Sequence, residues 1–293
     1  MFKPTVLASL LAFAAPAVFA QNSIEVEQLG DGNLAQILQG SQVDSSEISV
    51  TQVGDFNVAA VSQTGATFFN VASLQQLGDA NVASIEQSGR ANQLSAGSSG
   101  TANRLSAYQT GYANAQVSQS GEQNTLTFRQ QTFYEGSRLT VSQDGLGNQA
   151  EIVQGDGNRL TLAQEGRFNQ ALIRQGAYHN ELNFTQDGTG NRLDIDQNGF
   201  GGRIHGASTG SGNRVEVAQR FMSNHATVMQ SGNDNLASID QGNYGHQARI
   251  DQLGNANQAH ITQSLPTDDY TRLPGSAAIH QVGSANSATI IQQ

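Results

Sequence analysis

A short motif, Q-x-G-x-x-N, recurs twelve times along this chain of 293 residues and constrains its fold more than any other feature. Gly at the third position and Asn at the sixth are present in every copy, while Ser replaces the opening Gln in two copies. A further Gln follows eleven residues after the start of each copy, and successive copies begin about 22 residues apart. A period of this length indicates a stack of similar supersecondary units rather than an ordinary globular domain.

Apolar and polar residues alternate on both sides of the motif. The second and fourth residues after each motif Asn are apolar, as Leu193 and Ile195 are, and the same alternation precedes the motif, as at Leu182 and Phe184. Gly206 is the one clear exception. A period of two predicts β-strands, and the Gly-containing segments between them predict tight turns. We therefore expect two strands and two turns in each repeat.

The repeat also predicts how the strands are arranged. Two strands of a single repeat cannot bury their own apolar face, but neighbouring repeats can bury it by stacking. We therefore expect an all-β fold over residues 21–293, a flattened β-solenoid of about twelve coils, with two strands per coil of about 22 residues. Almost no helix is expected after Gln21.

The Gln and Asn of the repeat are in phase with the apolar residues, so their side chains are expected to point inward. An unpaired buried amide costs about 1–3 kcal/mol, whereas stacked amides can donate to one copy and accept from the other. Surface amides are the alternative, which the phase of the recurrence disfavours. The expected inward amide ladder comprises Gln28, Asn33, Gln39, Gln52, Asn57, Gln63, Gln76, Asn81, Gln87, Asn103, Gln109, Gln119, Asn124, Gln130, Gln143, Asn148, Gln154, Gln164, Asn169, Gln175, Gln186, Asn191, Gln197, Asn213, Gln219, Gln230, Asn235, Gln241, Gln252, Asn257, Gln263, Gln281, Asn286 and Gln292. The expected turn glycines are Gly30, Gly54, Gly78, Gly100, Gly121, Gly145, Gly166, Gly188, Gly210, Gly232, Gly254 and Gly283.

The first twenty residues differ from the rest. Lys3 is followed by an apolar segment from Val6 to Phe19, with small residues at Val18 and Ala20 before Gln21. This pattern predicts a secretory signal peptide over residues 1–20, removed by cleavage before Gln21. An uncleaved N-terminal anchor is the alternative.

One insertion interrupts the repeat near the C-terminus. It runs from Ser264 to Gly275 and carries Pro266 and Pro274. We interpret residues 264–275 as a loop, with a hinge between two domains as the alternative. The first coil is expected to begin directly after the signal peptide and the last to end at Gln292, with no polar capping segment. Because exposed strand edges are templates for further strands, this arrangement favours a unit that adds to itself.

The composition carries no sign of catalytic chemistry. The chain has a formal net charge of −10 and no Cys, which disfavours nucleic acid as a partner and excludes disulfides and thiolate metal sites. Asp268 and Asp269 are expected at a loop tip. Each of the six His is expected to be solvated, since they fall at different phases of the repeat: His179, His205, His225, His246, His260 and His280. We find no catalytic, metal-binding or cofactor-binding pattern and predict that the protein is not an enzyme.

The repeat resembles a known pattern. Ser46, Gln52, Gly54, Asn57 and Gln63 match S-x5-Q-x-G-x-x-N-x5-Q at every position. The same spacing recurs at Ser137, Gln143, Gly145, Asn148 and Gln154, and, with Asn first, at Asn70, Gln76, Gly78, Asn81 and Gln87. This is the curlin repeat of curli fibre subunits, and the resemblance extends over essentially all of residues 21–293.

The resemblance implies a function and partners. It implies a secreted structural subunit that polymerises outside the outer membrane into amyloid fibres, which serve biofilm matrix and surface adhesion. The implied partners are further copies of the chain itself, a nucleator subunit and an outer-membrane export channel. A minor nucleating subunit and a monomeric β-solenoid surface adhesin are the alternatives. Conversion of the purified mature protein to dye-binding fibrils at micromolar concentration would distinguish a fibre subunit from a monomeric adhesin.

Overall fold

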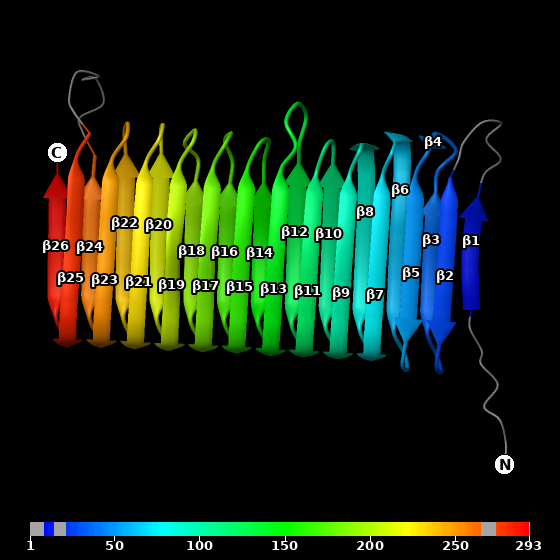
Figure 1. The fold of residues 1–293 in the computed structure, drawn as a ribbon, viewed down its shortest axis with the longest axis horizontal. Helices are drawn as coiled ribbons and strands as arrows, with labels where there is room; N and C mark the ends of the chain where they lie inside the picture. Colours follow the sequence, from blue (N-terminus) through cyan, green and yellow to red (C-terminus); the bar gives the residue numbers. More distant parts are fainter. Residues whose placement is uncertain (1–8, 15–21, 265–273, 293) are drawn as a thin grey trace, which may run out of the picture. The chain divides into compact units, whose positions relative to one another are not determined.

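The computed structural model describes residues 9–14, 22–264 and 274–292, which form two compact units, Met1–Gly147 and Asn148–Gln293. Every regular element among the described residues is a β-strand (Figure 1). The predicted all-β class is therefore confirmed. The division between the units lies between Gly147 and Asn148, far from the predicted insertion. Residues 265–273 of that insertion lie outside the described residues, as do residues 1–8 and 15–21 of the predicted signal peptide.

The first unit contains two parallel sheets. One has the order β1 (Ser9–Ala14), β3 (Leu34–Gln39), β6 (Val58–Phe68), β8 (Val82–Arg90), β10 (Arg104–Thr110) and β12 (Thr125–Gln131), with β4 (Val43–Asp44) also paired to β6. The other has the order β2 (Ser23–Leu29), β5 (Glu47–Val53), β7 (Val71–Asp79), β9 (Gln93–Thr101), β11 (Asn114–Glu122) and β13 (Arg138–Leu146).

The second unit repeats this arrangement. One sheet has the order β14 (Gln149–Gln154), β16 (Gln170–Gln175), β18 (Arg192–Gln197), β20 (Arg214–Arg220), β22 (Leu236–Gly242), β24 (Gln258–Gln263) and β26 (Ser287–Gln292). The other has the order β15 (Arg159–Arg167), β17 (Glu181–Thr189), β19 (Arg203–Ser211), β21 (His225–Asn233), β23 (Gln247–Asn255) and β25 (Ser276–Ser284).

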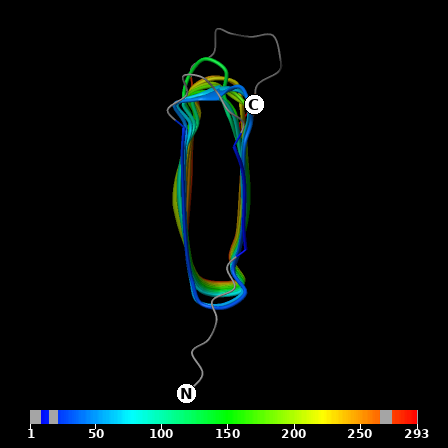
Figure 2. The same cartoon turned by 90° about the vertical axis from the view of Figure 1, so that its right-hand side faces the viewer.

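Within each unit the chain alternates between the two sheets, so each strand pairs with the strand of the next coil. The register places identical repeat positions side by side: Leu182 pairs with Ile204, and Leu193 with Val215. Seen along the stacking direction, the two sheets of a coil face each other across a narrow interior (Figure 2). This is the predicted flattened β-solenoid. The first unit holds five complete coils from β2 to β12, and the second holds six from β15 to β26, in agreement with the predicted number and the 22-residue spacing.

The interior is filled by the alternating apolar residues. Among the largest fully buried side chains are Phe128 and Phe184. Gly206, the exception in the sequence pattern, lies beside Phe184 of the preceding coil. A Cβ on Gly206 would lie 2.3 Å from the Val228 carbonyl oxygen and 2.6 Å from the Phe184 ring. The large ring thus occupies the space that an apolar side chain at 206 would fill.

The turn between the two strands of a coil lies within the motif and, from β7 onward, contains only two residues. Only Gly190 and Asn191 separate β17 from β18, because the strands extend through the motif Gly. The residue before the motif Asn has a positive φ whatever its type, as at Gly190 (66°), Ala102 (57°) and Phe168 (57°). The sharp reversal of the chain therefore occurs one residue before the Asn.

The glycines expected in the turns lie instead at or just beyond the ends of strands, with φ between 97° and 123°. They are required by close backbone approach between coils. A Cβ on Gly188 would lie 2.1 Å from the carbonyl oxygen of Gly210. No side chain fits at that distance, which explains why this position is Gly in the copies that are followed by another coil.

Candidate functional site

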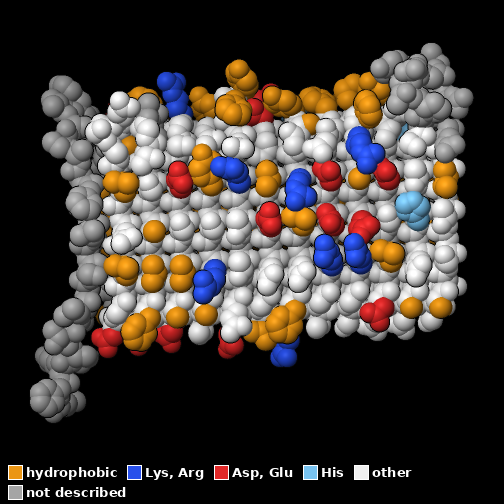
Figure 3. All heavy atoms as spheres, turned by 180° about the vertical axis from the view of Figure 1, so that it is seen from behind, with side chains coloured by type: hydrophobic (Ala, Val, Ile, Leu, Met, Phe, Trp, Pro, Cys, Tyr) orange, Lys and Arg blue, Asp and Glu red, His pale blue; other side chains and the backbone are white. Residues whose placement is uncertain are grey.

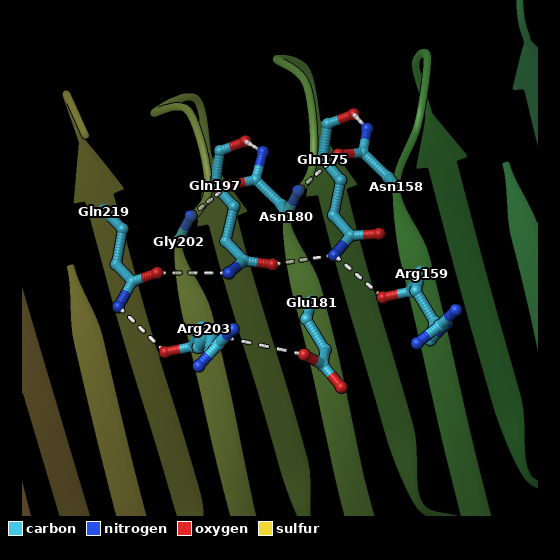
Figure 4. A network of polar contacts seen from close by, with 9 residues as sticks. All are labelled: Asn158, Arg159, Gln175, Asn180, Glu181, Gln197, Gly202, Arg203 and Gln219. Atoms are coloured by element: carbon cyan, nitrogen blue, oxygen red, sulfur yellow. Dashed lines mark hydrogen bonds and ion pairs between the residues drawn. The ribbon is translucent and has the colours of Figure 1, made fainter. Parts of the chain in front are cut away.

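The glutamines of the repeat form ladders of side-chain hydrogen bonds inside each unit. The Gln175 Nε2 donates to Gln197 Oε1 at 2.8 Å, and the Gln197 Nε2 donates to Gln219 Oε1 at 3.1 Å (Figure 4). In the other sheet Gln164 donates to Gln186 at 2.9 Å. The ladder glutamines are at most 6% exposed, except Gln28 and Gln292 in the first and last coils, which are half-buried. In every such bond the donor belongs to the earlier coil.

A second hydrogen bond fixes the orientation of most of the ladder amides. Gln219 Nε2 also donates to the Arg203 carbonyl on the facing sheet at 3.2 Å (Figure 4). In the same way, Gln230 Nε2 donates to the Arg214 carbonyl at 3.1 Å. Rotating the amide by 180° would turn its oxygen toward that carbonyl oxygen. The direction of the ladder is therefore set by the backbone.

Two serines replace Gln in the ladder, and each donates a hydrogen bond to the next coil. Ser98 Oγ donates to Gln119 Oε1 at 3.2 Å, and Ser208 Oγ donates to Gln230 Oε1 at 3.3 Å. Both serines are at most 2% exposed. A hydroxyl can donate in the same direction as an amide, so the direction of donation is kept. In the preceding coils, however, Gln76 and Gln186 donate to the Val58 and Gln170 carbonyls, at 3.2 and 3.1 Å, and not to these hydroxyls. The serines therefore interrupt the chain of side-chain hydrogen bonds.

The motif Asn forms a ladder in the opposite direction. The backbone N–H of Asn213 donates to Asn191 Oδ1 in the preceding coil at 3.1 Å. Its Nδ2 donates to the Thr209 carbonyl at 3.1 Å and to the Gly232 carbonyl of the next coil at 2.8 Å. The Asn thereby closes the tight turn and connects three successive coils by hydrogen bonds.

A second column of Asn lies at the opposite turn, and the predicted ladder did not include it. Asn180 N–H donates to Asn158 Oδ1, and Gly202 N–H donates to Asn180 Oδ1, both at 2.9 Å (Figure 4). The buried members of this column are Asn70, Asn92, Asn158, Asn180 and Asn224. Each of these Asn stands at the same distance before the alternating residues of a strand as the motif Asn does. This spacing could have identified them from the sequence.

His246 corrects the expectation that every His is solvated. It occupies the Asn position of this second column and is 3% exposed. Its backbone N–H donates to Asn224 Oδ1 at 3.0 Å, and its Nδ1 accepts the Gly275 N–H at 2.9 Å. Burial lowers the pKa of His246 from its ordinary value of 6.5, because the charged imidazolium is poorly solvated there. The side chain thus continues the column as a neutral acceptor.

This lowered pKa makes stability depend on pH. The unfolded chain takes up a proton at His246 at a higher pH than the folded chain, so stability is full above pH 6.5 and falls as pH decreases below it. We expect His246→Asn to remove this loss, since Asn supplies an acceptor without titrating. Amide hydrogen exchange of β25 at pH 7.5 and pH 5 tests this. The matched control is His179→Asn at an exposed position, which should keep the wild-type loss. Equal acid sensitivity of wild type and His246→Asn would contradict the assignment.

The first and last coils differ from the interior ones. In β2, Ile24 and Val26 are half-buried, and in β26 Ala288 and Ile290 are half-buried, whereas their counterparts in inner coils are buried. Asn286 is likewise exposed. Both terminal coils thus present interior side chains on one side.

The outer faces carry charged and neutral side chains side by side (Figure 3). Arg203 reaches Glu181 of the preceding coil at 3.6 Å, and Arg249 reaches Asp251 in its own strand at 2.6 Å. These side chains are largely exposed, and exposed ion pairs contribute about 0–1 kcal/mol each. The interior, and not the outer face, is therefore expected to contribute most to the stability of the site.

The described residues hold no cluster of three or more His, Cys, Asp or Glu side chains that could bind a metal ion. Asp268 and Asp269 lie outside the described residues. In the part of the chain that the structure describes, no helix is long and apolar enough to cross a membrane.

Comparison with known families agrees with the geometry. Residues 44–67, 210–242 and 234–264 match the family model for the curlin associated repeat. No curated protein matches the chain. The repeat matches and the β-solenoid are together consistent with a curlin-repeat protein.

Proposed function

We propose that this chain is a secreted, self-assembling structural subunit of curli-like extracellular amyloid fibres. The observation that carries the proposal is the state of the two terminal coils. The interior side chains of β2 and β26 are half-exposed and the amide ladders end at these coils, so another coil can continue both the apolar layer and the ladders.

The surroundings of such a fibre follow from the same proposal. Cleavage before Gln21 and passage through the periplasm would deliver the chain to an outer-membrane export channel, and a nucleator subunit would start the fibre. The fibre would lie at the cell surface, where it would contribute to biofilm matrix and adhesion. The interior of the solenoid supports a structural role rather than an enzymatic one, because its polar side chains are committed to the ladders.

The test is fibril formation by purified residues 21–293. We expect micromolar protein to convert to dye-binding fibrils whose fibre diffraction shows a meridional spacing of about 4.7–4.8 Å, since each added coil continues the strand spacing. Seeds of preformed fibrils should shorten the lag. A folded monomer that stays soluble in the presence of such seeds would refute fibre assembly and favour the monomeric adhesin.

A further inference from the structure

We propose that copies join head to tail in one register, with β25 and β26 of one copy stacked on β2 and β3 of the next. This inference rests on the proposed function, because it specifies the contact through which the fibre would grow. The partner of each terminal coil is thus a second copy of this chain.

The direction of the glutamine ladders supports this polarity. Gln28 donates to Gln52 and Gln39 donates to Gln63, so the first coil presents the Oε1 of Gln28 and Gln39 to an incoming copy. In the last coil, Gln292 accepts from Gln263 at 2.7 Å, while its own Nε2 donates one bond, to the Ser276 carbonyl. An NH₂ group has two protons, so one remains for Gln39 Oε1 of the next copy. Head-to-tail stacking therefore joins donors to acceptors.

The asparagine ladder supports the same head-to-tail polarity, with donors and acceptors exchanged between the two ends. Asn286 donates from N and Nδ2 to Asn257 Oδ1 at 3.1 and 2.9 Å, which leaves its own Oδ1 facing outward. Asn33 of the next copy would supply the backbone N–H, as Asn57 does to Asn33 at 2.9 Å within the chain. A head-to-head junction would instead oppose glutamine oxygens to glutamine oxygens, which repel.

The outward apolar side chains support one register. Continuing the pairing of equivalent positions places Leu29 beside Val282 and Leu38 beside Ile291. All four are exposed in the single chain, at 60%, 60%, 45% and 60% respectively. Stacking covers each with an apolar partner, whereas a shift of two residues would place Leu38 beside Thr289.

The proposed register also places side chains of complementary charge next to each other. Glu27 of β2 and His280 of β25 are both exposed and occupy equivalent strand positions. Within its own chain His280 is flanked by Asp251 of β23. Stacking would thus place His280 between two carboxylates, and a carboxylate beside an imidazole is favourable as an ion pair or a hydrogen bond.

The edge of β3 already accepts a strand of the required kind. β1 pairs with β3 in parallel, from Ser9 beside Leu34 to Ala14 beside Gln39. β26 pairs with β24 over the same six repeat positions, from Ser287 to Gln292. Because β1 lies within the predicted signal peptide, cleavage before Gln21 would remove it and free this edge for β26 of another copy.

Cysteine cross-linking tests the junction, since the native chain has no Cys. Residues 21–293 carrying Leu38→Cys and Ile291→Cys would be assembled under reducing conditions and then oxidised. Adjacent strands lie about 4.8 Å apart, within the Cα separation of 4.4–6.8 Å that a disulfide requires. We expect a ladder of covalent multimers on non-reducing gels. The pair Leu29→Cys and Val282→Cys provides a second, independent junction.

The controls separate register, polarity and function. Leu38→Cys with Thr289→Cys should give little cross-linking, because a two-residue offset moves the Cα atoms to about 8 Å apart, beyond disulfide reach. Leu38→Cys alone should give no covalent dimer. Dimers from that single variant, or fibrils of both matched pairs without ladders, would overturn the polarity or register while leaving fibre formation intact. Absence of wild-type fibrils would refute the proposed function and this inference with it.

Discussion

Gly188→Ala is expected to lower the free energy of unfolding by at least about 3 kcal/mol, through backbone strain and the loss of hydrogen bonds between coils. The added Cβ would lie 2.1 Å from the Gly210 carbonyl oxygen, which accepts a hydrogen bond from Asn191 Nδ2 at 3.0 Å. The two backbones must separate to relieve the overlap, and this separation breaks the Asn191 bond as well. Chemical denaturation of the folded chain, monitored by circular dichroism, measures the effect.

Gly190→Ala is the matched control for this prediction. Gly190 is two residues away and also has a positive φ, but a Cβ there would meet no atom within 4 Å. Its expected cost is therefore only the left-handed conformation, about 1–2 kcal/mol. Equal destabilisation by the two substitutions would show that φ alone, and not the approach of the next coil, requires Gly in the motif.

The strands, the parallel register and the inward phase of the side chains could be predicted because they depend on a period-2 pattern repeated twelve times. Leu182 and Phe184 precede the motif with the same alternation as their counterparts in every other coil except at Gly206. The structure gives the reason for that exception, since the ring of Phe184 occupies the space beside Gly206. A large residue in one coil is here matched by a small residue in the next coil. Such a pairing between coils cannot be recognised from the pattern of a single repeat.

The details of the turns could not be predicted because they depend on three-dimensional approach. The sequence marked the motif Gly as a turn residue, yet the sharp bend lies at the residue before the Asn, where Ala102 and Phe168 adopt positive φ. His246 was expected to be solvated because a single His carries no periodic signal. Its burial follows from the column it joins, between Asn224 and Gly275.

The two ladders stabilise each unit and also give the stack of coils a polarity. Glutamine side chains donate toward later coils, and Asn oxygens accept from later coils, so the two faces of any coil are chemically different. A stack built from such coils can be extended by a like coil in only one orientation. The same hydrogen bonds that stabilise the interior therefore determine how a further copy would be recognised.

Gln119→Ala should strongly destabilise the glutamine ladder of the first unit. Gln119 is 1% exposed, accepts from Ser98 Oγ at 3.2 Å, and donates to Gln143 Oε1 at 2.9 Å and to the Arg104 carbonyl at 3.0 Å. Its removal leaves several buried polar groups without this partner, each at about 1–3 kcal/mol, so we expect a loss of about 3 kcal/mol or more. For a soluble chain that is unfolded and folds as it joins the fibril, this corresponds to a rise of roughly 100-fold in the soluble concentration at equilibrium with fibrils, since 1.4 kcal/mol is tenfold.

Gln116→Ala is the control, because Gln116 lies in the same strand, β11, with an exposed side chain. The two substitutions are chemically identical and differ only in the face of the sheet from which the amide is removed. Gln116→Ala should leave the residual soluble concentration within about twofold of wild type, as expected for surface substitutions of about 0.5 kcal/mol or less. If the two variants leave equal soluble concentrations, the inward ladder is not what holds successive coils together, and the apolar layer alone must account for the stability of the stack.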